Sequence, residues 1–268
     1  MKSEIKQMQI GEIKMEYLLT GVENKDIILF VHGLGTNCSQ FENQHQYFQD
    51  RYKVLSVSLR GHGNTSSSRE LTETDFELSQ LGGDIIMLIE ALGIDKFHFV
   101  GNSMGGNIGY ELMKACPEKL LSFTSFGTTA KLKKSGFAIG LITFIYKTLS
   151  METIGVFSGS SGVSEPSKTK IVEMMSQAQK STVIKLISHL GNFDYLEVIK
   201  KSQIKVQIIR SDKDKEINKV IESTIETLKQ RGNFKLIDLA NSGHFANLDN
   251  PDLFNRTLET FLNGLDEY

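Results

Sequence analysis

A serine between two glycines has the setting in this chain that most favours covalent chemistry. Gly101 and Gly105 flank Ser103 in the segment 101–106 (GNSMGG), which follows an apolar run and precedes a helix-compatible run. A serine hydroxyl is a weak nucleophile, so the backbone must present it to a base and to groups that stabilise negative charge. A sharp turn from strand to helix does this. A Cβ at position 101 or 105 would collide with the neighbouring strand and helix, so the turn requires glycine there.

His244 is the candidate base among six histidines. It lies in the segment 241–247 (NSGHFAN), after the last apolar run and before the last helical pattern. This order places it at the C-terminal edge of a parallel sheet, where such folds assemble their sites. We expect His98 to lie inside a buried strand, and His45 and His189 to lie on exposed helical stretches.

A base of this kind needs a carboxylate that fixes its tautomer and stabilises its charged form. The segment 208–214 (IIRSDKD) follows the penultimate apolar run and offers Asp212 and Asp214. Both qualify by position, and the residues alone do not separate them. One of the two is expected to orient His244, while the other faces water or a neighbouring lysine.

Negative charge on a reacting carbonyl oxygen requires two backbone N–H groups near the serine. The N–H of Met104 follows the serine directly. The second donor is expected from the segment 32–35 (HGLG), after an apolar run. Gly33 and Gly35 allow this loop to point an amide inward, and the N–H of Leu34 is the candidate.

Alternating strand and helix patterns must position these residues. Strands are expected at 4–10, 13–20, 26–31, 53–57, 96–101, 120–126, 205–210 and 234–239, and helices at roughly 40–50, 76–92, 103–115, 215–231 and 251–264. The alternation predicts an α/β fold with a mostly parallel sheet covered on both faces. The first two strands form a hairpin with its turn at 11–12, which gives the sheet an antiparallel start.

Residues 128–200 interrupt this alternation. They contain an apolar run at 135–150, a Gly/Ser-rich link at 158–164 and two helical patterns from 166 to about 190. We interpret 128–200 as a helical cap inserted into a core formed by residues 1–127 and 201–268. The apolar run either packs on the main domain or forms an apolar wall over an acyl-binding pocket, and the two interpretations are compatible.

Composition excludes several classes of function. A net charge of −2 and a pI near 6.3 give no electrostatic footprint for nucleic acid. No uncharged apolar run is long enough to span a membrane. The start of the chain lacks the apolar region of a secretory signal, so we expect a cytoplasmic protein. Its two cysteines, Cys38 and Cys116, are then free thiols without metal-ligand spacing. Three prolines, no tryptophan and abundant Lys, Ile and Asn indicate an AT-rich bacterial genome.

Taken together, these segments resemble the α/β-hydrolase superfamily, in its serine-nucleophile, esterase- and lipase-like branch. The matching segments occur in the expected order: 32–35 (HGLG), 59–63 (LRGHG), 101–106 (GNSMGG), Asp214 within 211–214 (SDKD), and 242–244 (SGH). The resemblance implies the α/β-hydrolase fold, with a mostly parallel eight-stranded sheet, helices on both faces and an inserted helical cap.

The resemblance also implies a role for each matching residue. Ser103 would be the nucleophile, His244 the base and Asp214 the acid, with the N–H groups of Leu34 and Met104 as the oxyanion hole. The supporting loop residues would be His32, Gly33, Gly35, Gly101 and Gly105. No cofactor and no metal are implied.

The chain departs from the pattern of its relatives at three points. Ser211 replaces a glycine before the acid, and no proline follows Asp214. Ser58 stands where relatives have an aspartate, which removes an expected ion pair with Arg60 and leaves the anchoring of that loop unexplained. Neither the nucleophile nor the base is affected.

The function expected from these features is serine-dependent hydrolysis of carboxylic esters with a small or medium, apolar acyl group, through an acyl-enzyme. A serine rather than an aspartate at the turn argues against the haloalkane dehalogenase and epoxide hydrolase branches. One alternative is hydrolysis of carbon–carbon bonds in ring-cleavage products, because GNSMGG is similar to the turn of those enzymes. Another is a ligand sensor or signalling partner. We expect a small-molecule ester as the partner, and a monomer or homodimer.

Overall fold

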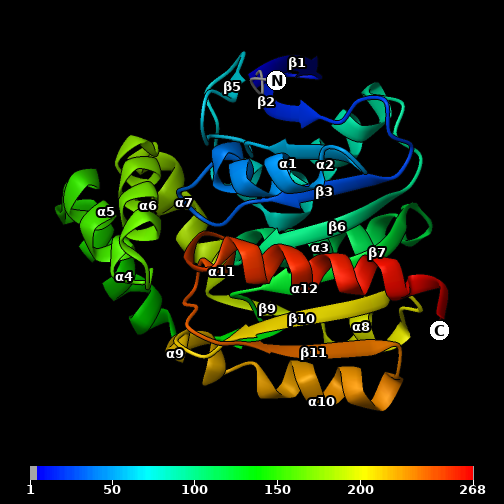
Figure 1. Cartoon of the computed structure of the whole chain (residues 1–268). Coiled ribbons are helices and arrows are strands. Elements are labelled where there is room, and N and C mark those ends of the chain that lie inside the picture. Colours follow the sequence, from blue (N-terminus) through cyan, green and yellow to red (C-terminus); the bar gives the residue numbers. More distant parts are fainter. Residues whose placement is uncertain (1–4, 268) are drawn as a thin grey trace.

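The structure is a computed structural model that describes residues 5–267. A central β-sheet lies between two layers of helices, and further helices form a separate group to one side of it (Figure 1). Residue 4, the first residue of the first expected strand, lies outside the described residues.

The main sheet runs in the order β1-β2-β4-β3-β6-β7-β10-β11. β1 and β2 form the predicted antiparallel hairpin and β2 pairs antiparallel with β4, whereas all pairings from β4 to β11 are parallel. The prediction of a mostly parallel sheet is confirmed. The strands are β1 (Ile5–Ile10), β2 (Ile13–Thr20), β3 (Ile27–Val31), β4 (Lys53–Val57), β6 (Phe97–Asn102), β7 (Leu120–Phe126), β10 (Lys205–Ser211) and β11 (Phe234–Leu239). A two-residue strand, β5 (Ser66–Ser67), pairs with β2, and β8 (Lys131–Lys133) pairs with β9 (Asn192–Asp194) in a separate small sheet.

Both faces of the sheet are buried, as strand β3 shows most clearly. Ile27 and Leu29 join the apolar core on one face, and Ile28 and Phe30 join the core on the other. The first core is covered by α2 (Leu78–Ala91), α3 (Met104–Ala115), α8 (Leu196–Lys201) and α10 (Glu222–Arg231). The second is covered by α1 (Glu42–Phe48) and α12 (Pro251–Asn263). Side chains that alternate between two apolar layers explain why these strands are continuous apolar runs in the sequence.

The remaining short elements are η1 (Cys38–Phe41), η2 (Thr74–Phe76), η3 (Pro117–Lys119), α9 (Lys215–Asn218), α11 (Ala246–Asp249) and η4 (Gly264–Glu267). The prediction of a single helix at 215–231 is therefore wrong, because this stretch forms two helices, α9 and α10. At the break, the Thr129 hydroxyl donates to the carbonyl of Val220 at 3.2 Å. Cys38 and Cys116 are buried free thiols.

Four helices lie within 128–200: α4 (Gly136–Thr148), α5 (Met151–Gly159), α6 (Glu165–Gln177) and α7 (Lys180–Leu190). Helix α5 was not predicted, because its glycines lower the helical signal of this stretch. Gly155 permits close packing instead, because a Cβ there would lie 2.7 Å from the Ser176 hydroxyl on α6. The apolar run packs on the main domain only in part: α4 has no fully buried residue and its main neighbour is α7. Tyr146 and Leu149 at the end of the run pack against a buried cluster that includes Phe245 of the main domain. In the described part of the chain, no helix is long and apolar enough to cross a membrane.

Arg60 is anchored despite the absence of an aspartate at position 58. Its guanidinium is 2% exposed and donates through Nε and Nη2 to both carboxylate oxygens of Asp84, each at 2.8 Å. Nη1 reaches Glu12 at 3.0 Å and Asp75 at 3.4 Å. The anchoring of Arg60, which the sequence left unexplained, therefore comes from carboxylates distant in the sequence.

The burial of the histidines outside the expected site differs in part from the prediction. His98 on β6 is buried as expected, with Nδ1 2.8 Å from the Ser122 hydroxyl. His45 was expected to be exposed, but it is 1% exposed, because its ring lies between the hydroxyls of Thr20 and Ser56. Burial lowers the pKa of His45 to about 3 and the pKa of His98 to about 4. His189 on α7 is half-buried.

Replacing Arg60 by alanine is expected to lower the free energy of unfolding by about 3–5 kcal/mol, because Asp84 remains buried without its partner. Arg210→Ala is the matched control, since it breaks a pair with Asp238 in which the aspartate is 63% exposed. The control is expected to cost at most about 1 kcal/mol. Urea unfolding of both variants measures the difference, and equal losses would contradict this account.

His98→Asn is expected to make stability less sensitive to acid. The folded state lowers the pKa of His98, so its contribution is complete above pH 6.5 and is lost as the pH falls toward about 4. Between these values the variant should show a pH slope of the unfolding free energy that is shallower by up to about 1.4 kcal/mol per pH unit. Urea titrations at several pH values measure it, with the half-buried His189→Asn as control. An unchanged slope in the His98 variant would refute the expectation.

Candidate active site

Ser103 occupies a strained turn between β6 and α3. Its φ of 52° and ψ of −119° are unusual for a residue with a side chain, and α3 begins at the next residue. The predicted need for glycine is confirmed: a Cβ on Gly101 would lie 2.6 Å from the Gly105 carbonyl carbon, and one on Gly105 would overlap the carbonyl oxygen of Val31. Helix α3 therefore begins in direct contact with the backbone of β3, and the turn holds Ser103 half-buried at the carboxyl end of β6.

His244 lies in the loop between β11 and α11 and is half-buried. Its backbone carbonyl accepts a hydrogen bond from the side-chain amide of Asn102 at 2.9 Å. Gly127, with a φ of +61°, also contacts this loop, since a Cβ there would lie 3.2 Å from His244 Cε1. Asn102 precedes Ser103, so one side chain links the serine turn to the histidine loop. Asn102 was not among the predicted site residues, and its only signal in the sequence is its place beside the serine.

The two candidate carboxylates have different surroundings. Asp214 is 7% exposed; its Oδ2 lies 2.8 Å from His244 Nδ1, and its Oδ1 accepts from the N–H of Ile217 at 3.3 Å. Asp212 is exposed, accepts from the N–H of Ser242 at 3.1 Å and forms an ion pair with Lys213 at 3.2 Å. Asp214 is therefore the carboxylate that the structure brings to the histidine.

The loop 32–35 lies beside the serine turn. A Cβ on Gly33 would be 3.2 Å from Ser103 Cβ, and Gly35 has a φ of +76°. Among the described residues, no hydrogen bond has the backbone N–H of Leu34 as its donor. The N–H of Met104 is in the first turn of α3, where an amide has no partner within its helix. Both expected oxyanion donors are therefore available to a ligand.

Two buried histidines hold this loop in place. His32 Nε2 accepts from the N–H of Leu59 at 3.0 Å, and His62 Nε2 accepts from the N–H of Gly35 at 3.1 Å. A ring nitrogen that accepts must be unprotonated, so both rings are neutral with hydrogen on Nδ1. Burial favours this state: it brings the pKa of His62 to about 4 and lowers the pKa of His32 well below its usual value.

The helices of 128–200 contact both sides of the site. The carbonyl of Ser161, after α5, accepts from the N–H of His244 at 3.3 Å, and Met175 on α6 lies against Gly35. Asp249 ties these parts together, since it accepts from the N–H groups of Val163 at 2.6 Å and Gly243 at 2.8 Å. Asp249 was not among the predicted site residues, because nothing in the sequence relates it to the link at 158–164.

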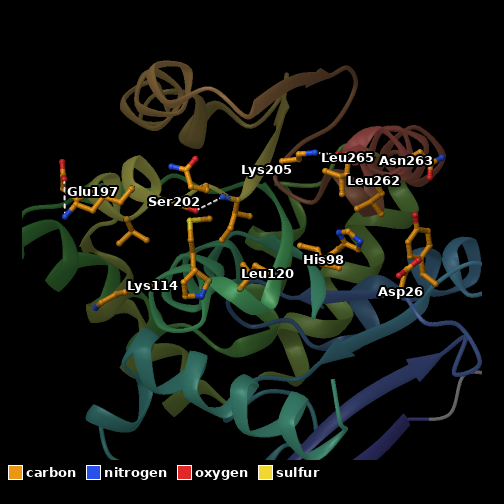
Figure 2. Close-up of a pocket in the computed structure, with 18 residues that line it drawn as sticks. Asp26, His98, Lys114, Leu120, Glu197, Ser202, Lys205, Leu262, Asn263 and Leu265 are labelled. Atoms are coloured by element: carbon orange, nitrogen blue, oxygen red, sulfur yellow. Dashed lines mark hydrogen bonds and ion pairs between the residues drawn. The ribbon is translucent and has the colours of Figure 1, made fainter. Parts of the chain in front are cut away.

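A groove of about 1380 Å³ lies at the opposite edge of the sheet, where β6, β7 and β10 begin (Figure 2). His98, Leu120 and Lys205 are among its lining residues, and Ser103, Asp214 and His244 are not. The groove is thus separate from the candidate active site. Within residues 5–267, no cluster of three or more His, Cys, Asp or Glu side chains is arranged to hold a metal ion.

Comparison with known proteins identifies the family to which this fold belongs. A family model described as the alpha/beta hydrolase fold matches residues 26–251. The chain is 25% identical over 267 residues to 3-oxoadipate enol-lactonase 2 of Acinetobacter baylyi, covering 94% of each chain. It is 24% identical to a putative carbamate hydrolase of Agrobacterium fabrum, covering 90% of this chain and 94% of that one. The solved enol-lactonase of Burkholderia xenovorans LB400 superposes with a TM-score of 0.85 at 18% identity, covering 96% of this chain and 100% of the other. The chain therefore belongs to the α/β-hydrolase family and is a hydrolase of the α/β type.

Proposed function

We propose that this protein hydrolyses carboxylic esters with a small or medium, apolar acyl group through an acyl-enzyme on Ser103. The observation that carries the proposal is the 2.8 Å contact between His244 Nδ1 and Asp214 Oδ2, in a loop that Asn102 ties to the strained Ser103 turn. A serine, a histidine and a buried carboxylate in this relation activate the hydroxyl as a nucleophile.

In the proposed reaction, Ser103 Oγ attacks the ester carbonyl carbon while His244 Nε2 accepts the hydroxyl proton. Asp214 holds the proton on Nδ1 and stabilises the imidazolium. The negative charge on the carbonyl oxygen is stabilised by the N–H groups of Leu34 and Met104. The C–O bond then breaks, and the alcohol leaves with the proton from His244. Water, deprotonated by His244, attacks the acyl-enzyme and releases the acid and free Ser103.

Two relatives that match along nearly their whole length, an enol-lactonase and a putative carbamate hydrolase, support ester chemistry. An enol-lactone is a cyclic ester, and a carbamate also presents a carbonyl carbon bonded to a heteroatom. We further propose that residues 128–200 act as a cap over the site. The contacts of Ser161 and Met175 with the histidine loop and the loop 32–35 support this role.

Ser103→Ala is expected to abolish hydrolysis of p-nitrophenyl esters from acetate to laurate, because no other hydroxyl stands at the turn. A fluorophosphonate should label the wild type stoichiometrically and the variant not at all. Ser66→Ala, which removes an exposed hydroxyl on β5, is the control and should retain both properties. Retained turnover in the Ser103 variant would refute the assignment. Labelling without turnover of any ester would favour carbon–carbon hydrolysis or ligand sensing instead.

Replacing each candidate carboxylate separately tests the role of Asp214. Asp214→Asn should lower kcat by about 10³–10⁴-fold, because the amide cannot hold the required tautomer of His244. Asp212→Asn should lower it by less than about tenfold, since Asp212 contacts a backbone N–H and Lys213 rather than the ring. Steady-state kinetics on the preferred ester measure both, and a larger loss from Asp212→Asn would reverse the assignment.

A further inference from the structure

Helices α4 and α5 expose an unusual number of large apolar side chains. We define the apolar cap face as Phe137, Leu141, Phe144, Ile145, Val156 and Phe157. Their exposed fractions range from 41% to 83%, the highest at Phe137. The four α4 residues are spaced at i, i+4, i+7 and i+8, so they share one face of the helix. Large apolar side chains exposed together in this way mark an interaction site.

The helices of this face lie on the outer side of the molecule. Figure 1 shows α4 and α5 (green) away from the sheet and its two helix layers. The main neighbour of α4 is α7, and that of α5 is α6. Gly191 contacts the opposite side of α4, since a Cβ there would lie 2.5 Å from Ile139 Cδ1. Ile139 therefore packs inward, while Phe137 and Phe144 remain exposed.

Positive charge gathers in the same part of the chain. Residues 128–200 contain nine lysines, no arginine and five carboxylates, for a net charge of +4, and the rest of the chain carries −6. The stretch 131–151 has four lysines and no carboxylate. Lys131 is paired with Asp194 at 2.8 Å, whereas Lys133 and Lys134 are exposed directly before α4 and Lys147 is exposed in its last turn. The apolar face of α4 is thus flanked by cations at both ends.

We propose that the apolar cap face docks on a lipid surface that carries anionic headgroups. Exposed phenylalanine and leucine side chains on one side of a helix enter the boundary between headgroups and acyl chains, and lysines beside them contact the phosphates. The apolar face and the exposed lysines at the two ends of α4 fit the two parts of such a surface. This docking is independent of the hydrolysis proposed above.

A second copy of the chain fits the same face less well. In a symmetric dimer, one patch meets its own copy, which would bring the lysines at the ends of α4 close to lysines at the ends of the partner's α4. Like charges brought together at the rim of an apolar contact oppose association. An anionic lipid surface turns the same lysines into favourable contacts.

Co-sedimentation with vesicles tests the proposal. The Ser103→Ala variant serves as the parent protein, so that hydrolysis of lipid does not affect the result. It should bind vesicles of phosphatidylcholine with phosphatidylglycerol more tightly than vesicles of phosphatidylcholine alone, and the difference should shrink as salt increases. Phe137→Ser with Phe144→Ser should lower the partition coefficient by about 100-fold or more. Lys133→Glu with Lys134→Glu should lower it by at least about 30-fold at low salt.

Lys96→Glu with Lys114→Glu is the matched control, because it makes the same change in net charge near the opposite edge of the sheet, where β6 begins and α3 ends. It should leave vesicle binding within about twofold of the parent, given that Lys96 and Lys114 are outside the face. The phenylalanine changes, made in the active protein, should leave kcat/KM for a soluble short-chain ester unchanged. No binding to anionic vesicles would overturn the proposal. So would an equal loss of binding in the control, or a phenylalanine variant that changes only KM for soluble esters.

Discussion

The close approach of helix α3 to strands β3 and β6 is the constraint on which the site depends. Gly105 brings the first turn of α3 into contact with the backbone of Val31, and Gly101 brings β6 into contact with the same turn. A larger residue at either position would force the helix or the strand to shift. A shift of the helix would move the N–H of Met104 relative to the N–H of Leu34, and the two donors of the oxyanion hole proposed above act together only when both reach one oxygen atom.

Behind Ser103 and His244 lies a network of buried polar side chains. Gln40 donates to the side-chain carbonyl of Asn102 at 3.0 Å, while the amide of Asn102 holds the His244 carbonyl. The side chain of Asn247 donates to the Gln40 carbonyl at 2.9 Å. Hydrogen bonds inside a protein are strong because the surroundings are weakly polar, and a satisfied network gives one well-defined geometry. The serine turn and the histidine loop, more than 130 residues apart in the sequence, are fixed relative to each other by these side chains.

The sequence predicted the features that follow from local periodicity. The strands were predicted because each is a short apolar run. The serine turn was predicted because glycine is required on both sides of the serine, where a Cβ would collide with the neighbouring strand and helix. Interactions between distant residues were not predictable. The anchoring of Arg60 by Asp84 and the burial of His45 depend on which elements become neighbours after folding. Asp212 and Asp214 lie two residues apart, and the direction of each side chain is set by a loop whose conformation no pattern encodes.

Asp249 has a consequence for how the molecule opens. Its carboxylate accepts hydrogen bonds from Val163 and Ser164 in the link after α5 and from Gly243 in the histidine loop. The carbonyl of Ser161 in the same link accepts from the N–H of His244. A movement of the link away from the core must either break these bonds or pull the backbone of His244 with it. Movement of the link and the position of the imidazole are thus mechanically coupled, because the link cannot move far from the core and leave the His244 backbone in place.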